Sequence, residues 1–143
     1  MTIQNNYEEK NWRTFFIIFI SYFAVFSVII IAGVNDVISS DICARGIFVL
    51  TSLMLILFAF VIKKHNRVYW ISGISYDDAC KMSESERKTT AENLYTTFTH
   101  AFVILLIYLI AGFICTTPLI LDSSVFTITV VFSSLKVMKH NYD

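Results

Sequence analysis

Residues 14–34 read TFFIIFISYFAVFSVIIIAGV, and none of these 21 residues carries a charge. A helix of this length rises roughly 30 Å, which matches the hydrocarbon core of a bilayer. Its fourteen Phe, Ile and Val residues together contribute about −4 to −8 kcal/mol on membrane-insertion scales. We therefore expect a membrane-spanning helix here, because the stretch is too long for the apolar core of a cleaved signal peptide.

The composition of the whole chain agrees with a membrane protein. Hydrophobic residues make up 56 % of the 143 positions and charged residues 15 %. A soluble domain would average about 45–50 % apolar residues and about a quarter charged residues. The formal net charge is zero, so no overall positive field attracts nucleic acid, and we expect no nucleic-acid partner.

Three further apolar stretches predict three more spans. We expect a single transmembrane domain over residues 1–143, with spans at about 14–34, 42–62, 97–115 and 119–138 and a loop at 63–96. Arg45 lies in the first turn of the second span, and Asp41 lies four residues earlier on the same helix face. This spacing predicts an ion pair at the interface. The alternative is that Arg45 extends alone to the lipid headgroups.

The fourth stretch is the least apolar, because hydroxyl side chains interrupt it. Thr117 and Pro118 precede it as a predicted N-cap and first helical residue, which favours a tight helical hairpin between the third and fourth spans. Hydroxyl groups in lipid bond to helix carbonyls or to neighbouring helices, so this helix should pack inside a bundle or an oligomer. We predict an all-α integral membrane protein with four transmembrane helices arranged as two hairpins. A three-span form is the alternative.

The positions of lysine and arginine predict the orientation. With the N-terminus inside, ten of the eleven basic residues face the cytoplasm, and Arg45 alone lies on the outer side. Cytoplasmic loops of membrane proteins carry such an excess of basic residues. We therefore expect an integral plasma (inner) membrane protein whose two termini are both cytoplasmic.

The one long polar stretch, KKHNRVYWISGISYDDACKMSESERKTTAEN at residues 63–93, holds eleven of the charged side chains. Ser75 followed by Asp78 predicts a short helix over about 76–82, and Ser83 followed by Glu86 predicts a capping box. Nothing interrupts a helix from there until Pro118. The third span should therefore be extended by a cytoplasmic stalk.

This loop is the candidate docking surface for a protein partner. Its 31 residues cannot bury enough apolar surface to form an independent domain, yet connections in helix bundles usually have only about 2–8 residues. We expect a platform or lid whose docking residues are charged: Asp77, Asp78, Lys81, Arg87 and Lys88. A solvated connector without a partner is the alternative.

Three intramembrane polar residues and two cysteines are further candidates. Ionisable residues inside a span suggest function, and His100 is such a residue, although a neutral histidine bonded to a nearby threonine is the alternative. Thr127 and Ser134 could line a polar path in an oligomer. Cys43 and Cys115 are expected at the outer ends of their spans, where either a disulfide or two free thiols can result.

No motif in the chain predicts catalysis. P-loop, HExxH and EF-hand patterns are absent from the sequence, so we expect no catalytic residues, no metal site and no cofactor. Small immunity, exclusion and accessory-subunit proteins of bacterial membranes share these general features. We expect a non-enzymatic protein that binds another protein in or at the membrane, with lipid as its surroundings. A homo-oligomeric pore or membrane-perturbing effector is the alternative.

Overall fold

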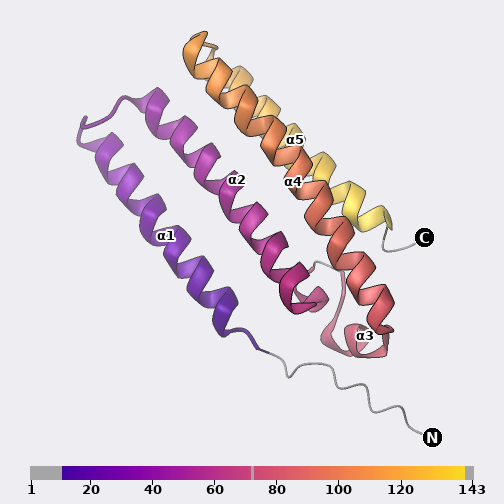
Figure 1. The fold of residues 1–143 in the computed structure, drawn as a ribbon. Coiled ribbons are helices and arrows are strands. Elements are labelled where there is room, and N and C mark those ends of the chain that lie inside the picture. Colours follow the sequence, from indigo (N-terminus) through magenta and orange to yellow (C-terminus); the bar gives the residue numbers. More distant parts are fainter. Residues whose placement is uncertain (1–10, 72, 141–143) are drawn as a thin grey trace, which may run out of the picture.

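The computed structural model describes residues 11–71 and 73–140, with the side chains of 138–140 excepted. Within these residues every regular element is helical, which confirms the predicted all-α class. The four long helices among these residues lie side by side (Figure 1). Their bounds, with those of two short helices between the second and the third, are α1 (Arg13–Val34), α2 (Ser40–His65), η1 (Val68–Trp70, a 3-10 helix), α3 (Tyr76–Lys81), α4 (Glu84–Ile114) and α5 (Leu119–His140).

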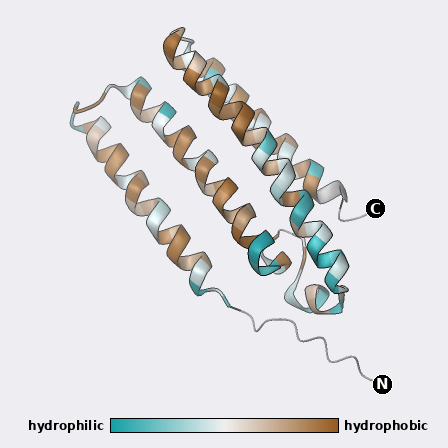
Figure 2. Cartoon of the chain, in the orientation of Figure 1, coloured by the Kyte–Doolittle hydropathy of each residue, from teal (hydrophilic) through white to brown (hydrophobic). Residues whose placement is uncertain are grey.

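The four long helices in the described part of the chain are long and apolar enough to cross a membrane, as the sequence predicts. Apolar residues dominate their middle sections, whereas the hydrophilic residues gather at the end of the molecule that carries α3 (Figure 2). The α1–α2 connection and the α4–α5 turn lie at the opposite end (Figure 1).

The predicted helix starts around the loop are confirmed. The Ser75 hydroxyl accepts a hydrogen bond from the backbone N–H of Asp78 at 3.1 Å and caps α3. At the start of α4, the Glu86 N–H donates to the Ser83 hydroxyl at 3.3 Å, while the Ser83 N–H donates to the Glu86 carboxylate at 2.6 Å. This capping box satisfies two backbone donors that the first helical turn leaves without partners. From it α4 continues for 31 residues without a break.

The packing centres on α2, which contacts α1, α4 and α5, while α4 also packs along α5. Buried side chains of α4, among them Phe102 and Leu105, form the core with partly buried residues of α2 and α5. Phe48 of α2 and Phe126 of α5 stack with their ring centroids 4.8 Å apart. By contrast, none of the residues of α1 is buried. In a bilayer, α1 is therefore covered mainly by lipid on every side except the one that faces α2.

Candidate functional site

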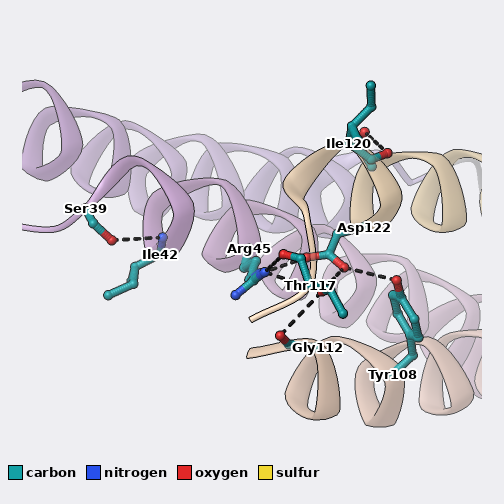
Figure 3. Close-up of polar contacts among 9 residues, drawn as sticks. Ser39, Ile42, Arg45, Tyr108, Gly112, Thr117, Ile120 and Asp122 are labelled. Atoms are coloured by element: carbon teal, nitrogen blue, oxygen red, sulfur yellow. Dashed lines mark hydrogen bonds and ion pairs between the residues drawn. The ribbon is translucent and has the colours of Figure 1, made fainter. Parts of the chain in front are cut away.

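A buried ionic network joins α2, α4 and α5 (Figure 3). It lies beside the α4–α5 turn, at the end of the bundle opposite α3 (Figure 1). Its centre is an ion pair between Arg45 Nε and Asp122 Oδ2 at 2.7 Å, between residues 77 positions apart in the chain. Asp122 is fully buried and Arg45 is only 8 % exposed. Removing charged groups from water costs several kcal/mol for each ion. Both groups therefore need further partners.

The surrounding turn and helix supply these partners. The second carboxylate oxygen of Asp122 accepts hydrogen bonds from the Thr117 hydroxyl at 2.7 Å and from the Tyr108 hydroxyl at 3.1 Å. Arg45 donates through Nη2 to the Thr117 carbonyl oxygen at 2.6 Å. The Phe113 ring lies 5.9 Å from the guanidinium carbon. The ion pair thus joins α2 to α5, and the Tyr108 hydroxyl joins α4 to the same carboxylate.

A glycine makes room for this network. A Cβ atom on Gly112 would lie 2.7 Å from the Thr117 hydroxyl oxygen and 3.3 Å from Asp122 Oδ1. The chain turns sharply here, because Thr116 adopts a left-handed conformation with φ 53° and the Thr117 N–H donates to the Gly112 carbonyl. The left-handed residue and this hydrogen bond are two features of the Schellman motif of helix ends. It brings the threonine hydroxyl back over the last turn of α4.

Two predictions about this region are wrong. Arg45 pairs with Asp122 and neither with Asp41 nor with the headgroups alone, because a buried carboxylate from another helix comes within hydrogen-bonding distance. Thr117 does not cap α5 with its side chain, because its hydroxyl donates to the Asp122 carboxylate. The first backbone bonds of α5 go instead to the Pro118 carbonyl, from the N–H groups of Leu121 and Asp122.

Chemically, the network is suited to holding helices together. The Asp122 carboxylate receives donors from three different residues, and its remaining surface is buried. A general base needs to reach a proton on a substrate, and a carboxylate so enclosed does not offer that access. We therefore interpret the network as a structural clamp between α2 and the α4–α5 pair.

At the opposite end, the loop folds onto the bundle as a loop cap, which we define as residues 66–71 and 73–93 with η1, α3 and the first turns of α4. Val68, Ala79 and Ala91 are each 0 % exposed and belong to one apolar cluster that also includes Ile62 of α2 and Val137 of α5. This burial fixes the loop cap on the ends of α2, α4 and α5.

Arg87 braces the loop cap from within. Its guanidinium is buried, with the residue 6 % exposed, and it donates to the Ala79 carbonyl at 3.1 Å and to the Met82 carbonyl at 2.5 Å. These carbonyls lie at the end of α3, so the cation also satisfies backbone groups that a helix C-terminus leaves open. The prediction that Arg87 is a docking residue is therefore corrected, because its charge is directed into the protein.

The other four predicted docking residues, Asp77, Asp78, Lys81 and Lys88, are exposed on the loop cap. Lys81 lies 4.0 Å from Asp78, too exposed a pair to stabilise the fold much. The Ser75 hydroxyl donates to the Asp78 carboxylate at 2.6 Å, and this hydrogen bond lowers the pKa of Asp78. The loop cap therefore presents exposed charges of both signs, while their role in docking stays a prediction.

The predicted intramembrane polar residues lie at three different places. His100 is exposed and lines a groove of about 530 Å³ between α4 and α5. Thr127 is exposed, and its hydroxyl donates to the Ser123 carbonyl of its own helix at 2.8 Å. Ser134 is the one hydroxyl residue lining an otherwise apolar cavity of about 340 Å³ among α1, α2, α4, α5 and η1. The structure does not join them into a polar path within one copy of the chain.

Cys43 and Cys115 are free thiols in the structure, so of the two alternatives expected for them it has the unbonded one. Cys43 lies against α1, where its thiol is 3.5 Å from the Ile29 carbonyl oxygen. A Cβ on Gly33 would come within 2.8 Å of its sulfur. Cys115 is exposed at the end of α4, and α1 packs on the far side of α2 from that helix.

Within residues 11–71 and 73–140, no group of three or more His, Cys, Asp or Glu side chains is placed to hold a metal ion. Comparison of the chain with protein-family models, with curated proteins and with solved structures finds no match.

Proposed function

We propose that this chain is a non-enzymatic membrane protein that acts by binding another protein through the loop cap, as an immunity, exclusion or accessory subunit does. The observation that carries this proposal is the packed loop cap. A simple connector needs neither a buried arginine brace nor an apolar core, whereas a docking surface gains affinity when its residues are ordered beforehand. The burial of Arg87 and of the alanines beside it supports such preorganisation.

The clamp at the other end is consistent with this role. It holds α2 against α4 and α5 at the end of the bundle opposite the loop cap, while an apolar cluster packs the helix ends beneath the loop cap. The Arg45–Asp122 pair is thus assigned to architecture and leaves the exposed charges of the loop cap as the candidates for recognition.

The proposal includes a topology of two helical hairpins with both termini in the cytoplasm and the first turns of α4 as a cytoplasmic stalk. The distribution of basic residues supports it, because this topology puts ten of them on the cytoplasmic side and one on the outer side. Reporter domains fused after Asn93 and after Asp143 should be active on the cytoplasmic side, and one inserted after Ser39 on the outer side. A loop cap facing outward would refute both the topology and a cytoplasmic partner.

Docking is tested by charge reversal on exposed residues. Full-length protein with Lys81→Glu and Lys88→Glu should lose proteins that co-purify with the wild type from native membranes in mild detergent. Lys64→Glu is the matched control, because Lys64 is an exposed basic residue at the end of α2 outside the loop cap. Loss in the double variant alone supports the proposal.

Equal co-purification by all variants would refute the loop cap as the docking surface. The pore alternative has its own measurement, which is ion flux into vesicles reconstituted with the purified chain. Flux above that of empty vesicles, together with unchanged co-purification, would favour the homo-oligomeric pore over partner binding.

A further inference from the structure

The groove between α4 and α5 is the second polar region of the spans, and the clamp does not account for it. Seven residues line its volume of about 530 Å³. Four are polar and three are apolar; they are Thr97, His100, Ser133 and Lys136, with Ala101, Phe132 and Leu135. All seven belong to α4 or α5, near the end of the bundle that carries the loop cap.

The charge in this groove is uncompensated. Neither Lys136 nor His100 forms a hydrogen bond or ion pair with any residue in the described ranges 11–71 and 73–140. The sequence of α4 has no acidic residue after Glu92, and that carboxylate binds Lys63 of α2 at 2.7 Å. The one acidic residue of α5, Asp122, is paired with Arg45 and lies roughly 21 Å away from Lys136 along the helix. A ligand for this groove should therefore bring negative charge.

The apolar lining determines what kind of anion fits. Phe132 and Leu135 are 69 % and 55 % exposed, and both lie beside the polar residues of the groove. In a bilayer such side chains contact acyl chains, while a lysine at a helix end reaches the headgroup region. Basic pockets between transmembrane helices commonly hold anionic lipid headgroups.

We propose that this groove binds one anionic phospholipid. The ammonium of Lys136 and the imidazole of His100 donate to its phosphate oxygens, and the hydroxyls of Thr97 and Ser133 provide further donors. Phe132 and Leu135 contact the first methylenes of the acyl chains. The position fits the headgroup level, since Lys136 lies in the last two turns of α5.

Native mass spectrometry of the full-length protein in mild detergent tests the proposal. Phosphatidylglycerol should bind more tightly than phosphatidylcholine of the same chain length, and Lys136→Gln should reduce the phosphatidylglycerol affinity about fivefold. His100→Gln should also reduce it, whereas Lys136→Arg should retain binding. Lys64→Gln is the matched control, because it removes an exposed basic residue outside the groove.

Each other outcome would overturn the proposal. Equal binding of the two lipids by the wild type excludes charge recognition, and unchanged binding by both glutamine variants excludes this groove. If Lys64→Gln loses as much phosphatidylglycerol affinity as Lys136→Gln, the binding reflects general attraction between basic residues and acidic lipid. Complete displacement by millimolar inorganic phosphate indicates a free-phosphate site, in which acyl chains take no part. Far-UV circular dichroism of each variant verifies that it is folded.

Discussion

Removing one charge of the Arg45–Asp122 clamp should destabilise the bundle more than any other conservative change in the chain. Asp122→Asn keeps the size of the side chain but leaves the guanidinium of Arg45, only 8 % exposed, without a counter-charge. It also weakens the acceptor for the Thr117 and Tyr108 hydroxyls, which lie 2.7 and 3.1 Å from Oδ1. Breaking a buried ion pair in this way costs about 3–5 kcal/mol.

A double-mutant cycle separates the pair from its surroundings. Arg45→Met should cost a similar amount, because it leaves the Asp122 carboxylate buried with only hydroxyl donors. The double variant Arg45→Met with Asp122→Asn should cost less than the two single changes added together, since no buried charge remains. The expected coupling is on the order of 1–3 kcal/mol.

Reversible unfolding in mixed micelles, with increasing sodium dodecyl sulfate and tryptophan fluorescence as the signal, measures these free energies. Asp41→Asn is the control, because Asp41 is an exposed acidic residue in the first turn of the same helix as Arg45. Its loss should cost no more than about 1 kcal/mol, the usual contribution of a carboxylate to a helix N-terminus. The clamp is refuted if Asp122→Asn is as mild as Asp41→Asn, or if the cycle shows no coupling.

Three further predictions concern single substitutions. The first uses the same unfolding assay, the second limited proteolysis and the third amide hydrogen exchange. Gly112→Ala should destabilise the protein by about 1–3 kcal/mol, because the new Cβ would meet a hydroxyl oxygen at 2.7 Å. Gly46→Ala is the control and should be neutral or stabilising, because the nearest neighbour of its new Cβ lies at 4.0 Å. Equal effects of the two substitutions would contradict the close fit at Gly112. Arg87→Gln should loosen the loop cap and increase its proteolysis, while exposed Lys88→Gln should leave the cleavage pattern unchanged; equal proteolysis of the two variants would argue against the brace. Ser83→Ala should cost about 1 kcal/mol of local helix stability, seen as faster amide hydrogen exchange in the first turn of α4; an unchanged exchange rate there would contradict the cap.

The sequence alone determines the helices, because their signals are local. A run of 21 uncharged residues predicts α1 by its length, and the serine caps at Ser75 and Ser83 begin α3 and α4 where the pattern predicts. Each of these signals lies within a few residues of the element that it predicts. Neighbouring helices are not needed to interpret them.

The tertiary structure alone decides which charged groups meet. Asp41, four residues from Arg45, is a reasonable local partner, yet the pair forms with Asp122, 77 residues away. Arginine is usually found at the surface, but the fold directs the Arg87 side chain at the carbonyls of Ala79 and Met82. A signal for the clamp was present in the sequence, since it places an arginine and an aspartate in the first turns of two different predicted spans.

The physical reason is the difference in range between the two kinds of interaction. Transfer of apolar side chains into lipid and the capping of helix ends depend on neighbours along the chain, so a window of residues contains them. Ion pairing depends on distance in space and on burial, and both follow from how the helices pack. Cys43 illustrates the same point, because its depth is readable from its span, whereas its contact with α1 follows from the close approach of the two helices at Gly33.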